Sequence, residues 1–106
     1  MRFLVIGKNR SPVPPDIAPA LFDAMIAWVN KIKASGKVEA LWGTAGVAGG
    51  GAILNVDSAD ELDAIMIEFP FAPFSEITIV LIVDIVESLQ RSKQAMLAMM
   101  QGGGGR

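Results

Sequence analysis

Few side chains in this 106-residue chain could carry out acid–base or metal chemistry. Histidine, tyrosine and cysteine are all absent, which removes the commonest general base, the commonest metal ligand and every thiol. Proton transfer would therefore need Asp, Glu, Lys or bound water. Asp23 is the candidate catalytic base, because it is the one carboxylate within a long apolar segment. A solvated edge or a subunit contact is the alternative role for Asp23, and Glu39 and Asn55 are weaker candidates.

Large apolar side chains are the candidates for lining a small-molecule pocket. Trp28 and Trp42 could each cover an apolar ligand, with the indole N–H as a polar handle. Phe22 and Met25 lie in the same apolar segment as Trp28 and are predicted to bind the same ligand. Plain core packing explains large aromatic residues equally well, so that alternative stays open for both tryptophans.

Charge and motif content argue against several kinds of partner. The net charge is −2 and the Lys and Arg residues are scattered, so nucleic acid is not an expected partner. No cluster of oxygen ligands suggests a metal, and no cofactor is predicted. The glycine-rich run at residues 46–51 joins two predicted strands and opens no helix, so it lacks the helix N-terminus of a phosphate site. Gly49–Gly51 are predicted to form a hairpin turn.

The elements that would position these residues follow the order β-α-β-β-α-β. Apolar runs predict strands at residues 2–8, 37–46, 52–57 and 76–83, and helical spacing predicts helices at about 16–34 and 58–69. Asp16 is expected to cap the first helix, and Ser58 and Glu61 form a capping box at the second. This order is the ferredoxin-like α+β fold, an antiparallel four-stranded sheet with both helices on one face.

The remaining segments extend this single domain. A third helix is predicted at about 84–101, so the domain spans residues 1–101, and the glycine-rich residues 102–106 are predicted to form a flexible tail. No apolar run has membrane-spanning length, and the apolar stretch at residues 3–6 is too short for a secretory signal. We therefore expect a cytoplasmic protein with no membrane partner.

The apolar content predicts self-association. Hydrophobic residues make up 52% of the chain and charged residues only 19%. The first and fourth strands are apolar on both faces, whereas the helices can cover only one. The first helix is apolar nearly all round: Trp28 is expected to face the sheet with Ile17, Leu21 and Ala24, leaving Phe22 on a second side. A homodimer with two sheets packed face to face, or a higher oligomer, would bury this surface.

Two stretches carry a family resemblance. They are Leu-Trp-Gly-Thr-Ala-Gly at 41–46 and Phe-Pro-Phe-Ala-Pro-Phe at 69–74, the latter leading into Ile-Thr-Ile at 77–79. They resemble the muconolactone isomerase family over roughly residues 1–83, with the third helix outside the match. The resemblance implies a ferredoxin-like fold that pairs into a dimeric α/β barrel. It also implies a pocket between sheet and helices for a small lactone carboxylate, and cofactor-free movement of a double bond by proton removal and return.

The chain also departs from the family pattern. Residues 24–27 are Ala-Met-Ile-Ala where the family has Glu and Lys residues, and Val47 stands where a His is usual. An apolar pocket thus replaces a proton-shuttling one. We predict a muconolactone-isomerase-like protein that binds a small, mostly apolar lactone or ring compound, acting as a cofactor-free isomerase, cyclase or lyase. The alternative is a non-catalytic oligomeric binding or assembly module. A carboxylate or lysine pointing into a closed cavity would favour the enzyme.

Overall fold

The computed structural model describes residues 1–46 and 48–104. Its element order is β-α-β-β-α-β with a C-terminal helix, which confirms the predicted ferredoxin-like α+β fold. Val47, one of the predicted departures from the family, and residues 105–106 lie outside the described residues. The elements are β1 (Arg2–Asn9), α1 (Ala18–Ala34), β2 (Val38–Gly43), β3 (Gly49–Asn55), α2 (Ala59–Ile67), the short 3₁₀ helix η1 (Ala72–Phe74), β4 (Ser75–Ile82) and α3 (Ile85–Gly104).

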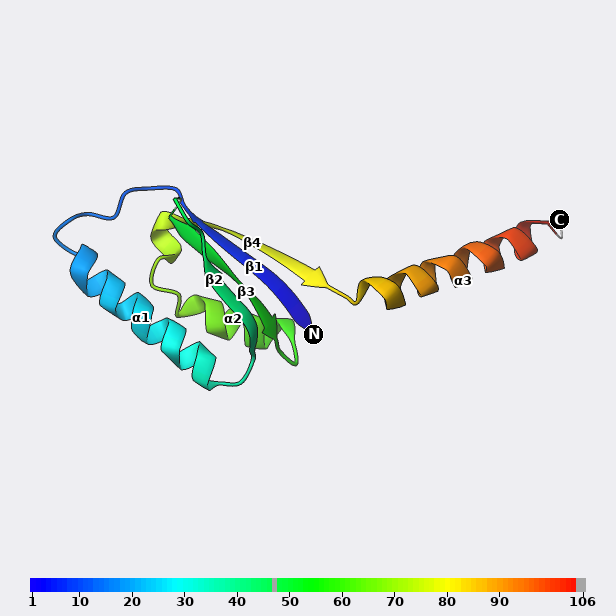
Figure 1. Ribbon diagram of the computed structural model, residues 1–106, viewed down its shortest axis with the longest axis horizontal. Coiled ribbons are helices and arrows are strands. Elements are labelled where there is room, and N and C mark those ends of the chain that lie inside the picture. The colour runs from blue at the N-terminus through cyan, green and yellow to red at the C-terminus, as the bar shows by residue number, and fades with distance from the viewer. Residues whose placement is uncertain (47, 105–106) are drawn as a thin grey trace.

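One four-stranded antiparallel sheet forms the centre of the domain. Its strand order is β2-β3-β1-β4, and α1 and α2 both lie on one face of it (Figure 1). Alternate residues of β1 point toward the helices, so Phe3 and Val5 are buried whereas Ile6 is exposed. The buried cluster joins the two central strands to α2 and consists of Phe3, Val5, Ala52, Leu54, Val56 and Leu62.

Helix α1 begins without the predicted side-chain cap. Its N-cap residue is Ile17, which has no capping hydrogen bond from a side chain, so the prediction for Asp16 is wrong. The carbonyl of Pro14 instead accepts hydrogen bonds from the N–H groups of Ile17 and Ala18, at 3.2 and 3.1 Å. A backbone carbonyl of the preceding loop therefore accepts hydrogen bonds from N–H groups at the start of the helix, in place of a side-chain cap. Gly36 follows the helix at φ 76°, a conformation that suits glycine and stops the helix.

Helix α2 has the predicted N-terminal signature in a modified form. The Ser58 hydroxyl accepts a hydrogen bond from the N–H of Glu61 at 3.1 Å, as expected for a capping box. The Glu61 carboxylate reaches back to the N–H of Asp57 at 2.9 Å rather than to that of Ser58. The cap therefore fixes both the start of α2 and the end of the loop before it.

The hairpin between β2 and β3 differs from the prediction. Gly49, Gly50 and Gly51 all belong to β3 rather than to the turn, which falls earlier and contains Gly46 at φ 75°. A side chain at position 49 or 50 would collide with neighbouring backbone, because a Cβ on Gly50 would lie 2.6 Å from the carbonyl oxygen of Trp42. The glycines thus allow a close strand approach that the residue pattern does not reveal.

Helix α3 extends away from the domain (Figure 1), giving a molecule of 70 × 27 × 24 Å. Asp84 caps it by accepting a hydrogen bond from the N–H of Glu87 at 2.9 Å. The helix continues to Gly104, so Gly102 to Gly104, predicted to lie in the tail, are helical. Within residues 1–46 and 48–104, no helix has both the length and the apolar character needed to cross a membrane.

Candidate functional site

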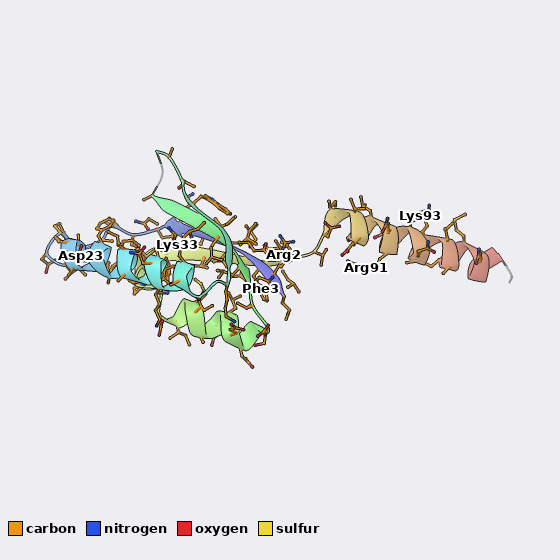
Figure 2. All side chains as sticks on the ribbon, turned by 60° about the horizontal axis from the view of Figure 1, so that its bottom comes forward. Arg2, Phe3, Asp23, Lys33, Arg91 and Lys93 are labelled. Atoms are coloured by element: carbon orange, nitrogen blue, oxygen red, sulfur yellow. The ribbon has the colours of Figure 1, made fainter. Side chains whose placement is uncertain are left out.

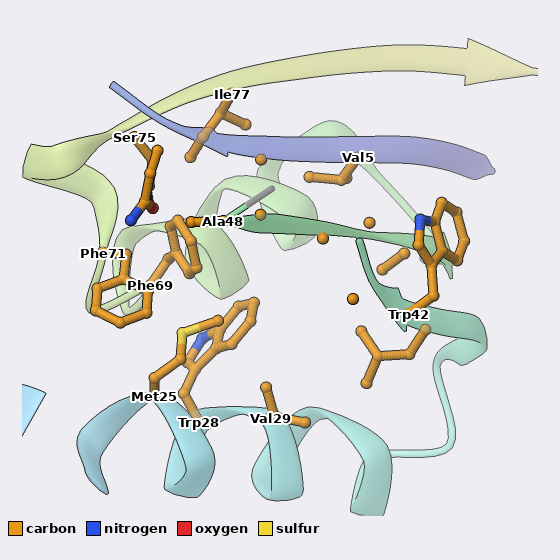
Figure 3. Close-up of a pocket in the computed structure, with 18 of the residues that line it drawn as sticks. Val5, Met25, Trp28, Val29, Trp42, Ala48, Phe69, Phe71, Ser75 and Ile77 are labelled. Carbon is orange, nitrogen blue, oxygen red and sulfur yellow. Dashed lines mark hydrogen bonds between the residues drawn. The ribbon is translucent and has the colours of Figure 1, made fainter. Parts of the chain in front are cut away.

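A cavity of about 520 Å³ lies between the sheet and α1 (Figure 3). Every strand contributes to its wall, and most of the lining is apolar. Strand β1 supplies alternate residues, because those are the ones that face the helices. The wall residues from the sheet include Val5, Gly7, Asn9, Leu41, Trp42, Ala52, Ser75 and Ile77, and those from the helices and the following loop include Phe22, Met25, Ile26, Trp28, Val29, Met66, Phe69 and Phe71.

The predicted binding residues meet at this cavity. Phe22, Met25 and Trp28 come from α1, and Trp42 comes from β2. Figure 3 shows Met25 and Trp28 directed from α1 toward the strands, with Trp42 at the other end of the cavity. That these four residues bind a ligand stays a prediction.

The predicted division of α1 into two faces is right for Trp28, which faces the sheet (Figure 3), but wrong for other residues. Ala24, expected to face the sheet, is exposed, whereas Phe22, expected on the far side, lines the cavity with Trp28. Phe22, Met25, Ile26 and Val29 recur at the i, i+3, i+4, i+7 spacing of one helix face. Because α1 is apolar on most sides, its periodicity does not indicate which face turns inward.

A chain of aromatic rings forms one end of the cavity. The ring centroids of Trp28 and Phe69 lie 5.1 Å apart, those of Phe69 and Phe71 6.4 Å, and those of Phe71 and Phe22 5.2 Å. These separations and the tilted or edge-to-face angles are typical of favourable aromatic pairs. Phe69 and Phe71 were not among the predicted lining residues. The signal was present, because both belong to the Phe-Pro-Phe-Ala-Pro-Phe loop singled out as a family feature.

The two tryptophans differ in what their indole groups can do. The Trp28 N–H donates a hydrogen bond to the carbonyl oxygen of Ile65 in α2, at 3.2 Å, so it is engaged within the fold rather than offered as a polar handle. Trp42 is 41% exposed and its indole lies against Gly51. A Cβ at Gly51 would be 2.4 Å from Trp42 Cζ2, so only glycine leaves room for this indole position.

Two polar side chains of the wall, Asn9 and Ser75, lie next to each other. They are cross-strand partners at the ends of β1 and β4, and Ser75 Oγ is 3.5 Å from Asn9 Oδ1. Figure 3 places Ser75 at the end of the cavity that holds Phe71. Neither residue was predicted to line the cavity, because both were expected in loops and only the strand register brings them together.

Asp23, the predicted base, does not line the cavity. Its side chain is exposed on α1 (Figure 2), because it lies about 140° round the helix from Trp28, which faces the sheet. None of the described residues in the cavity wall has an ionisable side chain. The described wall therefore brings no acid or base of its own to a bound ligand.

Glu39 and Asn55, the weaker candidates, belong to a surface network outside the cavity. Arg2 Nη2 lies 2.8 Å from Glu39 Oε2, and Arg2 Nε donates to the same oxygen at 2.9 Å. Asn55 Nδ2 donates to Glu39 Oε1 at 3.3 Å. The hydrogen bond from Arg2, and then the charge of Arg2, hold the pKa of Glu39 below its ordinary value, and the same contacts raise the pKa of Arg2. Among the described residues, no three His, Cys, Asp or Glu side chains gather where they could hold a metal ion.

The comparisons with known proteins agree with this fold. Residues 1–84 match the family model described as muconolactone delta-isomerase. A crystal structure of muconolactone isomerase is similar with a TM-score of 0.71 and 22% identity, covering 79% of this chain and 90% of that one. The 5-chloro-2-hydroxyhydroquinone dehydrochlorinase of Burkholderia phenoliruptrix AC1100, in complex with 2,5-dihydroxybenzoquinone, is similar with a TM-score of 0.62 and 22% identity, covering 78% and 94%. No curated protein matches the chain.

The family match ends where α3 begins, so the C-terminal helix lies beyond it. The matched part contains the whole sheet, both packed helices and every described wall residue of the cavity. Over these residues the chain belongs to the muconolactone delta-isomerase family.

Proposed function

We propose that the cavity binds a small, mostly apolar ring compound. The observation that carries this proposal is a cavity of about 520 Å³ whose described wall is aromatic and aliphatic and has no ionisable side chain. A cavity of this size and lining is typical of sites for small organic molecules. The relatives support the same class of ligand, since one is named for a lactone and the other holds a benzoquinone.

Binding has firmer support than catalysis. Isomerase, cyclase or lyase chemistry by proton transfer needs a proton acceptor near the ligand, and the described wall supplies none. A cofactor-free enzyme step therefore stays a prediction, and so does the role of Asp23 as its base. An Asp23→Asn variant should bind ligand as the wild type does, because Asp23 lies outside the wall.

A tryptophan fluorescence titration with single-ring compounds tests the proposed binding. Trp28 and Trp42 both line the cavity, so saturable quenching is expected from a bound ring. Val29→Phe would fill part of the cavity and should weaken binding by roughly tenfold, since lost space excludes the ligand. Ala27→Phe is the matched control, because Ala27 is exposed on the same helix and outside the wall. Absence of saturation with every compound would refute the proposal.

We also propose that the chain self-associates with a second copy through β4 and α3. Ile79, Val80 and Leu81 of β4 are all exposed, and α3 carries further exposed apolar residues such as Leu89 and Met96. Most of the stability of a helix in a protein comes from packing of its apolar face. Helix α3 would gain this stability by packing against a partner surface. Two copies related by a twofold axis can satisfy both surfaces at once, because each copy provides the same apolar strand and helix. The dimeric barrel and any larger assembly remain part of this proposal.

A further inference from the structure

The Asn9–Ser75 pair is a fixed polar position in an otherwise apolar part of the cavity. The strand ends that carry it are held by backbone hydrogen bonds, from Asn9 N–H to the carbonyl of Ala48 at 3.0 Å and from Arg10 N–H to the carbonyl of Phe74 at 2.8 Å. Both side chains are half-buried. The strand ends therefore fix the backbone positions from which the two side chains reach the cavity wall.

This pair has hydrogen-bonding capacity that the described part of the protein does not use. The Ser75 hydroxyl donates to Asn9 Oδ1 over 3.5 Å, which is long for an O–H donor. The amide NH₂ of Asn9 has no partner among the described residues. An amide NH₂ can donate two hydrogen bonds, and a serine oxygen can also accept. The pair thus offers both donors and an acceptor to a ligand.

The surroundings of the pair restrict what the ligand can be. Phe71 and Phe69 also line the cavity, and Ser75 lies at their end of it (Figure 3), so a planar ring can lie against aromatic faces. No described wall residue is a lysine or arginine. A carboxylate entering the cavity would lose part of its hydration and gain no counter-charge from the described wall, which is unfavourable.

We propose that Asn9 and Ser75 hold the polar group of the ligand, so that the cavity selects a neutral ring carrying a carbonyl or hydroxyl. This inference rests on the proposed function, because it assigns the ligand's polar end within the same cavity. It predicts that the cavity binds such a ring more tightly than a plain hydrocarbon of the same size, and that the difference depends on Asn9 and Ser75. It also predicts exclusion of the matching carboxylate, in contrast to a site built for an acidic lactone.

Three probes of similar shape separate these requirements: p-xylene, p-cresol and p-toluate, with dissociation constants measured by calorimetry at neutral pH. Asn9→Leu keeps a similar volume but removes the amide. It should weaken p-cresol by roughly tenfold and leave p-xylene equal or tighter, since one hydrogen bond is lost only for the cresol. Ser75→Ala should lower the affinity for p-cresol, relative to that for p-xylene, by about threefold. Leu41→Ala, elsewhere in the wall, is the control and should weaken both probes equally.

The possible results distinguish failure of the pair from failure of the cavity. If p-cresol and p-xylene bind the wild type but respond equally to Asn9→Leu and Ser75→Ala, this inference is overturned and the binding proposal stands. Binding of p-toluate as tight as that of p-cresol would also overturn it. If no probe binds the wild type, the proposed function fails together with the inference. If circular dichroism shows that Asn9→Leu does not fold, Ser75→Ala decides. An unchanged ratio of p-cresol to p-xylene affinity in that variant would overturn the inference.

Discussion

Trp28 combines a structural role with a place in the cavity wall. Its indole N–H is bonded to the carbonyl of Ile65, and its ring lies 5.1 Å from that of Phe69. Trp28 therefore connects α1 to α2 and forms part of the cavity wall. Trp42 has less support, because it is 41% exposed on edge strand β2.

Replacing each tryptophan by phenylalanine should separate these roles. Trp28→Phe removes a partner from the Ile65 carbonyl and should lower the free energy of unfolding by about 1–3 kcal/mol. Trp42→Phe, the control, should cost less than about 1 kcal/mol because its side chain is already partly in water. Urea unfolding at one fixed protein concentration measures both. Equal losses for the two variants would contradict this assignment.

The Trp42 indole depends on the bare backbone of Gly51. Gly51→Ala would place a methyl group 2.4 Å from Trp42 Cζ2, so the indole must move and the tryptophan emission maximum should shift. Gly43→Ala is the matched control, since a Cβ there meets its nearest atom at an ordinary 3.9 Å. Identical emission spectra for the wild type and Gly51→Ala would show that the indole does not lie on Gly51.

The Arg2–Glu39 pair predicts a weak pH dependence of stability. Because Arg2 lowers the pKa of Glu39 from its ordinary value of 4.5, the native state holds this proton less tightly than the unfolded state does. The stabilisation is therefore fully present above about pH 4.5 and is lost as the pH falls through the lowered pKa of Glu39. The effect should be small, since the pair is exposed. Thermal unfolding of wild type and Glu39→Gln should give melting temperatures that converge on acidification, and a constant difference would contradict the prediction.

At the scale of elements, local pattern predicted the order of strands and helices but not how they face one another. The strands at β1 and β4 follow from their apolar runs, and α2 from Ser58 and Glu61. The glycines of β3 were predicted to form a turn, because glycine favours turns on local grounds. Their place in the strand depends instead on the close approach of neighbouring backbone, which is not a local property. Asn9 and Ser75 could be brought together only by the register of β1 and β4, which is a long-range property.

The cavity was predictable only in part for the same reason. Phe22, Met25, Trp28 and Trp42 stand out by size, and all line it. The inward face of α1 was not predictable, since a helix that is apolar nearly all round gives no unique face. Asp23 was chosen because it is the one acid in that segment, but its position round the helix places it outside the wall.

Considered as a whole, the molecule has a small core and a long arm, α3, that carries exposed apolar residues beside its polar ones. The buried hydrophobic residues lie mostly on β1, β3 and α2, whereas exposed large hydrophobic residues continue from Ile79 to Met100. Monomeric proteins rarely expose large apolar patches to water. This contrast, rather than composition alone, is the physical basis of the proposed self-association.

Charges on the apolar side of α3 should break this association. Leu89→Asp with Met96→Asp places two carboxylates on exposed apolar positions and should give a monomer by light scattering at low micromolar concentration, because burying charges at an interface is costly. Gln90→Asp with Gln94→Asp adds the same charge to polar positions of the same helix and should leave the oligomer intact. A monomeric mass for the wild type would refute the association.

The most direct test of ligand binding in the cavity uses the methionine methyl groups as reporters, observed by NMR during a titration with p-cresol. Met25 and Met66 line the cavity, whereas Met96 and Met100 lie exposed on α3. We predict saturable shifts of the Met25 and Met66 methyl signals, with those of Met96 and Met100 unchanged. Shifts confined to the α3 methionines, or none at all, would contradict the central claim that this cavity binds a small ring compound.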